Sequence, residues 1–185
     1  MTIFEKKKFE RHTFKKFRDE ISIKQRENVE KNVKLYVDSF VKEHKNIGYI
    51  AIYWPLNNEI DIRSLKDKIS LALPRCKDNK ELLFYPWDEK ALTKDSEGIL
   101  SPNNSFSLSH KQISLIFVPC LSVDKNLIRL GYGGGYFDKL RRDKNWRNVP
   151  CIGVLTSNCL STNPLTKAEW DIPLSGFITE KEIFV

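Results

Sequence analysis

A dense run of glycines in the second half of the chain limits the fold more than any other feature. Four of the eight glycines lie within residues 131–135, inside the sequence Arg-Leu-Gly-Tyr-Gly-Gly-Gly-Tyr-Phe-Asp at 129–138. Glycine loses more backbone entropy on ordering than other residues, so this run predicts a loop. The apolar run at 113–118 predicts a buried strand before the loop, and residues 136–142 predict the first turns of a helix after it.

A glycine loop between a strand and a helix is suited to binding an anion. Without Cβ atoms in the way, backbone N–H groups can turn toward a phosphate. The spacing differs from a dinucleotide fingerprint, which needs glycine where Tyr136 stands, and from a Walker A loop, which ends in Gly-Lys-Ser/Thr. An ordinary turn is the alternative. Arg129 and Asp138 at the two ends favour phosphate binding, because they supply a cation and a candidate metal ligand.

Length and composition predict one domain, spanning 1–185, with one sizeable core. Hydrophobic residues make up 41% and charged residues 30%, which is ordinary for a soluble globular protein, and no apolar run is long enough to span a membrane. The charged segment 1–14 does not resemble a secretory signal. The four cysteines lack Cys-x-x-Cys spacing, which favours buried free thiols in a reducing cytoplasm over a zinc site. We expect a monomer without membrane contact.

The net charge of +7 is concentrated near the N-terminus. Residues 1–45 hold 13 Lys and Arg against 8 Asp and Glu. A nucleic-acid partner is one interpretation of this excess. The acids are interleaved with the bases, however, and no basic stripe alternates with exposed aromatic residues. A solvated helical face explains the pattern better, and we expect no nucleic-acid partner.

Two helices are predicted before the first strand. Residues 3–20 show helical apolar spacing, and Lys7 and Arg11 stand four residues apart, so both cations lie on one side of that helix. A solvent-facing pair is the simplest interpretation of those cations from the pattern alone. Ser22 and Gln25 form a capping box that begins the second helix.

Strands alternate with helical patterns through the rest of the chain. The predicted strands are 47–54, 82–87, 113–119 and 149–155. This order predicts an α/β fold, an open sheet with helices on both faces. Glu59 follows the first strand at its carboxyl end, where ligands bind in such sheets. It could instead cap a helix that begins near Ile62. Residues 94–102 are predicted to form an exposed connection.

The glycine loop also resembles the signature loop of the 5-formyltetrahydrofolate cyclo-ligase family, whose members are also called methenyltetrahydrofolate synthetases. The likeness extends to the segments Lys7–Arg11, Tyr53–Glu59 and Glu169–Thr179. It departs from the family at Ser101, where relatives usually carry glutamate, and at Gly134, where some carry lysine. The resemblance implies a mostly parallel sheet and allows one reversed edge strand.

The resemblance assigns roles to particular residues. Lys7 and Arg129 are the implied catalytic cations, and Glu59 is an implied folate ligand because its carboxylate suits the paired donors of a pterin. The implied ATP-binding residues are Lys7, Arg11, Arg129, Leu130, Gly131, Tyr132, Gly133, Gly134, Gly135, Tyr136 and Phe137. The implied substrate-binding residues are Trp54, Glu59, Tyr132 and Tyr136. The implied metal ligands are Asp138 and Asp171.

The resemblance implies ATP- and Mg²⁺-dependent conversion of 5-formyltetrahydrofolate to 5,10-methenyltetrahydrofolate, with release of ADP and phosphate. Two alternatives from other classes stay open at this point. One is an α/β enzyme that acts on a phosphorylated sugar or acyl substrate without ATP. The other is a non-catalytic basic domain that binds RNA.

Overall fold

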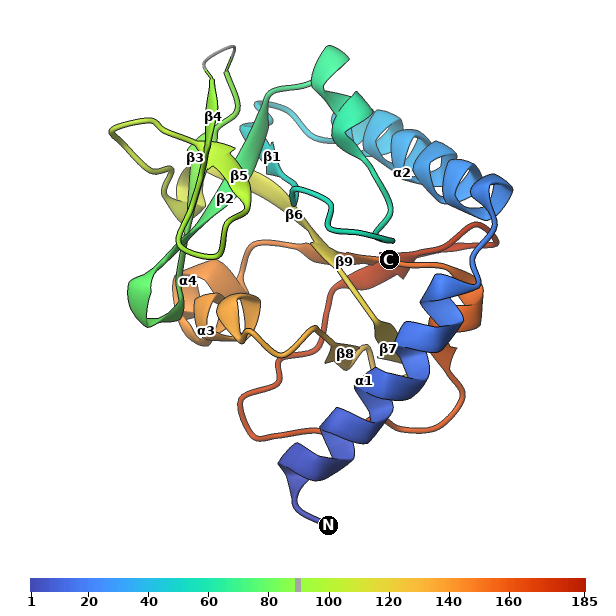
Figure 1. Cartoon of the computed structure of the whole chain (residues 1–185). Coiled ribbons are helices and arrows are strands. Elements are labelled where there is room, and N and C mark those ends of the chain that lie inside the picture. Colours follow the sequence, from blue (N-terminus) through green and yellow to red (C-terminus); the bar gives the residue numbers. More distant parts are fainter. Residues whose placement is uncertain (89–90) are drawn as a thin grey trace.

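A computed structural model describes residues 1–88 and 91–185. A seven-stranded sheet, in the order β12-β11-β9-β6-β1-β2-β3, runs through the middle of the molecule (Figure 1). The strands are β1 Tyr49–Ala51, β2 Leu71–Lys77, β3 Glu81–Pro86, β4 Leu92–Lys94, β5 Leu100–Pro102, β6 Ile113–Pro119, β7 Ser122–Asp124, β8 Arg129–Leu130, β9 Cys151–Val154, β10 Leu160–Ser161, β11 Gly176–Ile178 and β12 Ile183–Phe184. The α/β prediction is therefore confirmed.

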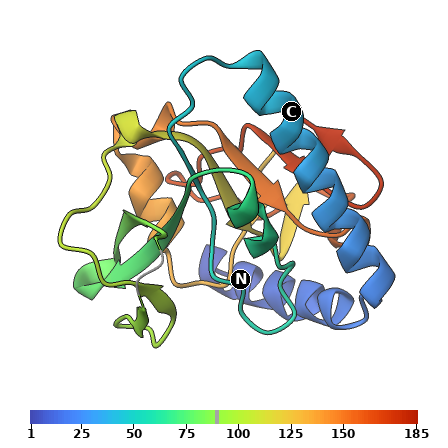
Figure 2. The ribbon, with the colours of Figure 1, turned by 90° about the horizontal axis from the view of Figure 1, so that it is seen from above.

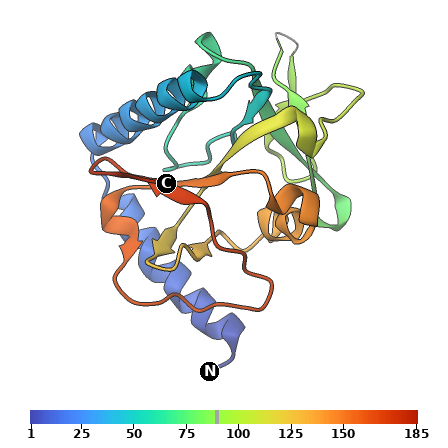
Figure 3. The ribbon, with the colours of Figure 1, turned by 180° about the vertical axis from the view of Figure 1, so that it is seen from behind.

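The five inner strands of the sheet are parallel and both edge strands are reversed. β3 pairs antiparallel with β2, and β12 pairs antiparallel with β11. The C-terminal strands, in red, lie toward the viewer in Figure 3. From β1 the chain builds outward in one direction to β2 and β3, and from β6 it builds in the other direction to β9 and β11. The crevice between β1 and β6 is thus a point where ligands bind in open sheets.

In the part of the chain that the structure describes, four α-helices surround the sheet, with short 3₁₀ turns between the strands. They are α1 Ile3–Asp19, α2 Ile23–Glu43, α3 Tyr136–Arg142 and α4 Lys144–Arg147. The 3₁₀ turns are Arg63–Asp67, Asp78–Lys80, His110–Gln112 and Ser157–Cys159. Viewed from above, α2 lies on one side of the strands and α3 on the other (Figure 2). Helices on both faces were predicted, because buried parallel strands need cover on each side.

Each face of the sheet has its own apolar cluster. Val29, Val33 and Val37 of α2 pack with Ile50 and Phe117 on one face. On the other face, Leu140 of α3 packs with Phe84, Ile116 and Cys151 among others. A third, smaller cluster joins α1 to the minor sheet β10-β7-β8 through Phe14, Leu121, Ile128, Leu130 and Leu165. This third cluster fixes α1 beside the loop that follows β8.

Several local predictions need correction. The strand predicted at 47–54 is only Tyr49–Ala51, and its continuation is a loop that reaches the site. The helix expected near Ile62 is a 3₁₀ turn, Arg63–Asp67. Residues 94–102 belong to a hairpin of β4 and β5 and are not a plain connection.

The strand β2 was missed because Pro74 interrupts it. Proline has no N–H for a ladder hydrogen bond and is excluded from most central strands. The parallel pairing of β2 with β1 ends at Ala72, so Pro74 pairs only with Phe84 of β3. The proline therefore occupies a part of β2 that has one partner strand, where the missing donor is tolerated.

The capping box of α2 provides a test of the local reading. Ser22 accepts the Gln25 N–H at 3.2 Å, and the Gln25 side chain accepts the Ser22 N–H at 3.1 Å. Replacing Ser22 with Ala should lower the free energy of unfolding by about 1 kcal/mol, measured by urea denaturation. The replacement of Ser107 by Ala, at an exposed loop position outside any helix, is the control. Equal effects at both positions would contradict the capping role.

Candidate active site

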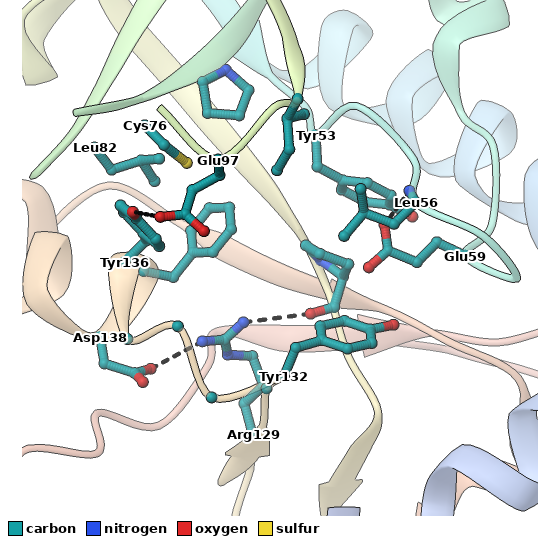
Figure 4. Close-up of a pocket in the computed structure, with 18 of the residues that line it drawn as sticks. Tyr53, Leu56, Glu59, Cys76, Leu82, Glu97, Arg129, Tyr132, Tyr136 and Asp138 are labelled. Carbon is teal, nitrogen blue, oxygen red and sulfur yellow. Dashed lines mark hydrogen bonds and ion pairs between the residues drawn. The ribbon is translucent and has the colours of Figure 1, made fainter. Parts of the chain in front are cut away.

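One cavity of about 270 Å³ lies at the carboxyl ends of β1 and β6 (Figure 4). The predicted site residues all line it: Lys7, Arg11, Trp54, Glu59, Arg129, Leu130, Gly131, Tyr132, Gly133, Gly134, Gly135, Tyr136, Phe137, Asp138 and Asp171. These residues come from α1, the loop after β1, the glycine loop, α3 and the segment before β11. The fold therefore brings together segments that are far apart in the sequence, while the roles of the residues stay predictions.

The glycine loop has a backbone that other residues adopt only with strain. Gly133 has φ +106° and Gly135 has φ +78°, both in the region that favours glycine. At Gly131 the restriction is spatial, since a Cβ there would lie 3.0 Å from Nη2 of Arg129. The loop is also contacted by residues from other elements: Arg11 donates to the Gly131 carbonyl oxygen, and the Lys80 side chain lies beside Gly135. These contacts distinguish it from a simple flexible turn.

Helix α1 places two cations against this loop. Arg11 donates from Nε to the Gly131 carbonyl oxygen at 2.9 Å, and its guanidinium lies beside Gly133. Lys7, one turn earlier, forms an ion pair with Asp171. Lys6 and Lys8 are exposed, so the structure selects Lys7 and Arg11 as the pair that faces the cavity. A positive wall therefore stands next to the backbone of the loop.

Arg129 is a buried cation at the floor of the cavity. Its Nη2 lies 2.8 Å from Oδ1 of Asp138, and its Nη1 donates to the Pro119 carbonyl oxygen at 3.3 Å (Figure 4). Burial raises the pKa of Asp138, but the charge and hydrogen bond of Arg129 outweigh it, so the net pKa lies below the ordinary value. Asp138 therefore remains an anion and a candidate metal ligand at neutral pH.

Glu59 presents a carboxylate to the opposite end of the cavity. Its Oε2 accepts the Leu56 N–H at 2.8 Å, closing the turn after β1. Its Oε1 is buried and has no hydrogen-bond partner among the described residues. Burial raises the pKa of Glu59 above its ordinary value. A buried acceptor without a donor is costly, so this atom is suited to a ligand that brings one.

Of the two roles that the sequence left open for Glu59, the helix cap is not observed and the folate contact stays a prediction. Glu59 closes its own turn with one oxygen and leaves the other toward the cavity. The predicted cap of a following helix is wrong, because the N-cap of the 3₁₀ turn is Ile62 and has no side-chain cap.

Apolar and aromatic side chains complete this half of the cavity. Tyr53, Trp54, Leu56, Leu82 and Ile99 line it together with Tyr132 and Tyr136. The Arg63 guanidinium stacks over the ring of Trp54, with Cζ 4.3 Å from the ring centre. Such a wall suits a flat ring system, whereas the glycine-loop half suits phosphates.

The hairpin of β4 and β5 contributes residues that the sequence did not indicate. Its turn residue Glu97 accepts the Tyr136 hydroxyl at 2.5 Å across the cavity. Asp95 anchors the hairpin to β2 by accepting the Cys76 N–H at 2.8 Å. The missed lining residues are Tyr53, Leu56, Pro74, Cys76, Leu82, Asp95, Glu97, Ile99 and Pro119. Of these, Tyr53, Leu56 and Ile99 lie in segments that resemble the family, and Leu82 and Pro119 belong to predicted strands.

The two departures from the family pattern have different consequences. Ser101 is fully buried in β5, where its hydroxyl contacts the Thr93 carbonyl oxygen at 3.4 Å, and it does not line the cavity. Gly134 adds no cation, but Lys80 in the β2–β3 turn lies close by. A Cβ at Gly135 would be 4.0 Å from Nζ of Lys80. The cationic surroundings of the loop therefore extend beyond the predicted residues.

The thiol that lines the cavity is not a nucleophile. Burial raises the pKa of Cys76 to about 12, so it stays protonated at neutral pH. All four cysteines are buried and free, which confirms the prediction of free thiols. Within residues 1–88 and 91–185, no helix has the length and apolarity needed to cross a membrane.

Fold and site together define an α/β protein with a cavity in which a glycine loop and nearby cations face an aromatic half that holds a buried carboxylate. The family model of the 5-formyltetrahydrofolate cyclo-ligase family matches residues 3–180. The chain therefore belongs to the 5-formyltetrahydrofolate cyclo-ligase family, whose members are ATP-dependent ligases.

Relatives agree with this assignment over most of the chain. The 5-formyltetrahydrofolate cyclo-ligase of Haemophilus influenzae is 26% identical over 175 residues, which cover 89% of this chain and 92% of the relative. The 5,10-methenyltetrahydrofolate synthetase of Aquifex aeolicus, solved by NMR, superimposes with a TM-score of 0.77 at 25% identity, covering 96% of this chain and 91% of that one. The synthetase of Mycoplasma pneumoniae has a TM-score of 0.72 at 22% identity, covering 94% and 98%, and supports the fold.

Gly133 tests the glycine loop as a phosphate-binding element. We expect Gly133→Val to raise the KM for ATP at least about tenfold, because the loop must abandon a backbone that valine disfavours. Gly98→Val is the matched control, since Gly98 has φ +75° but nothing within 4 Å of its Cβ position. It should lower Tm without the same change in the KM for ATP. A normal KM for ATP in a folded Gly133→Val protein would contradict phosphate binding by this loop.

Proposed function

We propose that this protein converts 5-formyltetrahydrofolate to 5,10-methenyltetrahydrofolate, using ATP and releasing ADP and phosphate. Family membership supports the activity. The observation that carries the proposal within the structure is one cavity with two unlike halves, a cationic glycine loop and an aromatic wall that ends at Oε1 of Glu59. An ATP-independent enzyme acting on a phosphorylated substrate would not need the aromatic half of the cavity with its buried carboxylate. A domain that binds RNA would not need both halves in one cavity.

The ATP phosphates fit the half of the cavity around the glycine loop. The loop supplies backbone N–H groups, and Lys7, Arg11 and Arg129 supply three cations from two elements. Lys7 and Arg129 are paired with Asp171 and Asp138, so their charges are held in place before a substrate arrives. Phosphoryl transfer depends mostly on positioning and charge neutralisation, which these groups provide.

The folate fits the aromatic half. A pterin offers an amino group and a ring N–H as adjacent donors, and Oε1 of Glu59 is a buried acceptor that lacks one. Trp54, Tyr132 and Tyr136 provide surfaces for the flat rings. The formyl group would then point toward the phosphates, because both halves belong to one cavity.

The chemistry proceeds in two steps. The formyl oxygen first attacks the γ-phosphorus of ATP, so an O–P bond forms and the bond to the ADP oxygen breaks. N10 then attacks the activated formyl carbon, the carbon–oxygen bond breaks, and phosphate leaves with the former formyl oxygen. N10 loses its proton as the ring closes, and the departing phosphate can accept it. The protein needs no general base for this sequence.

Asp138 and Asp171 are suitable for holding Mg²⁺ with the nucleotide. Both carboxylates line the cavity beside the glycine loop. The described residues contain no group of three or more His, Cys, Asp or Glu able to hold a metal alone, which agrees with an ion that takes one or two carboxylates and completes its shell with phosphates and water. Bound there, Mg²⁺ would neutralise charge on the β- and γ-phosphates.

A single assay separates the proposal from the alternatives. Protein, ATP and 5-formyltetrahydrofolate are mixed, and the absorbance of the methenyl product is followed. We expect product only when ATP and protein are both present. Product formation without ATP, or no product at all, would contradict the proposal and would revive the ATP-independent enzyme or the RNA-binding domain.

We infer further that the protein acts as a monomer in the cytoplasm. The predicted site residues from α1, the glycine loop and the segment before β11 meet within one copy of the chain, which supports a monomer. Four buried free thiols are suited to a reducing compartment. Light scattering of the purified protein checks the monomer.

Glu59 tests the folate half. We expect Glu59→Gln to raise the KM for 5-formyltetrahydrofolate roughly tenfold or more, because a charge-assisted hydrogen bond of about 1.5–3 kcal/mol is lost, while the KM for ATP changes little. Glu27→Gln, an exposed position on α2, is the control. A lower Tm with unchanged kinetics would show that Glu59 only closes its turn.

The two aspartates test the metal assignment. Asp138→Asn and Asp171→Asn should each reduce turnover and raise the Mg²⁺ concentration needed for half activity. Because both act on one ion, the double variant should be little worse than the poorer single variant. Asp67→Asn, exposed in a 3₁₀ turn, serves as control. An unchanged Mg²⁺ requirement in Asp171→Asn would show that this residue only pairs with Lys7 and the Ala168 N–H.

A further inference from the structure

Arg18 lies at the end of α1, behind the wall that Tyr132 and Glu59 form at the folate end of the cavity. It is not among the residues that line that cavity. Its side chain is nevertheless only 14% exposed, whereas most arginine side chains are exposed unless they are paired. Its contacts, rather than its position in the sequence, suggest a function.

The guanidinium of Arg18 holds the hydroxyl group of Tyr132. Nη1 donates to the Tyr132 oxygen at 2.9 Å, and Cζ lies 5.4 Å from the centre of the ring. Arginine can only donate hydrogen bonds, so the tyrosine oxygen must be the acceptor in this contact. The proton of the tyrosine hydroxyl is therefore directed away from Arg18 and toward another acceptor.

The carboxylate that faces this hydroxyl is Glu59. Figure 4 shows the Tyr132 hydroxyl on the side of the ring nearer Glu59, and Arg18, Tyr132 and Glu59 line one small pocket behind the cavity wall. Oε2 of Glu59 already accepts the Leu56 N–H, whereas Oε1 has no partner among the described residues. The tyrosine proton and a substrate donor are thus the groups available to Glu59.

A second set of contacts fixes Arg18 relative to the loop that carries Glu59. Arg18 Nη2 lies 3.2 Å from Oδ1 of Asp19, and the same oxygen accepts Nδ2 of Asn58 at 2.9 Å. Asn58 is the residue before Glu59 and has φ +66°. The end of α1 and the Glu59 turn are therefore connected by a short chain of polar contacts.

We propose that Arg18 is a positioning residue for the folate site, which holds the Tyr132 hydroxyl beside Glu59 and, through Asp19 and Asn58, the turn that presents Glu59 to the pterin. This inference rests on the proposed function of Glu59 as the pterin ligand. Arg18 would then be a charged residue outside the cavity that helps to determine how folate binds.

The charges around Glu59 decide the direction of the expected effect. Burial raises its pKa, while the Leu56 N–H, Tyr132, Arg18 and Arg129 lower it. The other charged or titratable groups that face this region are Tyr53, Asp61, Cys120 and, at the Glu59 carbonyl oxygen, Arg26. Removing Arg18 takes away one lowering influence and frees the tyrosine proton. The pKa of Glu59 must then rise further.

The sign for folate binding follows directly. If ionised Glu59 binds the pterin, the KM for 5-formyltetrahydrofolate increases as the pH falls through the pKa of Glu59. In Arg18→Met that increase should begin at a higher pH than in the unmodified protein, because Arg18 is one of the groups that lower the pKa of Glu59. The KM for ATP should not follow, because Arg18 does not contact the glycine loop's phosphate-binding side.

The experiment measures the KM for folate and for ATP between about pH 5.5 and about pH 8, a range that brackets a raised glutamate pKa. The variants are Arg18→Met, Arg18→Lys and Tyr132→Phe, with the exposed Lys16→Met on the same helix as control. Arg18→Lys keeps the charge and should shift the folate profile less than Arg18→Met. Tyr132→Phe keeps the ring and should shift it in the same direction. The double variant Arg18→Met/Tyr132→Phe should be no worse than the poorer single variant.

Direct titration of 5-formyltetrahydrofolate without ATP provides a second readout. It should show the same shift in affinity with pH. If the unmodified protein forms methenyl product but neither Arg18→Met nor Tyr132→Phe moves the folate profile, the positioning role is overturned and the proposed function stands. If the unmodified protein forms no product, the proposed function fails instead. Should Arg18→Met not fold, Arg18→Lys decides, since it removes the guanidinium that binds the Tyr132 oxygen and keeps the charge.

Discussion

The site depends on the docking of α1 against the glycine loop. Arg11 binds the Gly131 carbonyl oxygen and Lys7 pairs with Asp171, while Phe14 on the same helix is buried against the minor sheet. Apolar burial thus holds the helix in place, and the cations are positioned as a consequence. Because these contacts already order the side chains of Lys7 and Arg11, little side-chain conformational entropy remains to be lost when phosphates bind.

Ion pairs with Asp171 and Asp138 hold the cations Lys7 and Arg129 in position beside the loop. Arg129 is buried and would be costly alone, but Asp138 compensates its charge. The carboxylates that neutralise the cations are also the proposed metal ligands. Binding of a nucleotide with its metal would therefore exchange one set of ion pairs for another, so that no buried charge is left without a partner at either stage.

Features set by neighbouring residues could be predicted from the sequence. The helix 136–142, the strand 113–119 and the capping box at Ser22 were predicted with their observed bounds, because glycine, apolar runs and caps act locally. The positions around the cavity came from motifs of the family, and the fold places them together. The strand β2 was missed because local propensity at Pro74 disagreed with its tertiary setting.

Contacts between distant residues could not be predicted. Glu97 and Tyr136 are 39 residues apart, and Arg18 and Tyr132 are 114 apart, so no spacing rule connects them. Neither Glu97 nor Arg18 carries a motif of its own. The place of Glu97 at the cavity results from the hairpin β4–β5, and the place of Arg18 behind the cavity wall results from the packing of α1, and only the folded chain determines both.

The coupling of ATP use to ring closure tests the central claim most directly. In a reaction with both substrates, phosphate release and methenyl formation are measured together in the same sample. If one cavity holds both substrates, phosphate should appear in equal amount to methenyl product, and neither should appear when 5-formyltetrahydrofolate is left out. Phosphate release that continues without folate, or methenyl product that forms without phosphate, would contradict the account.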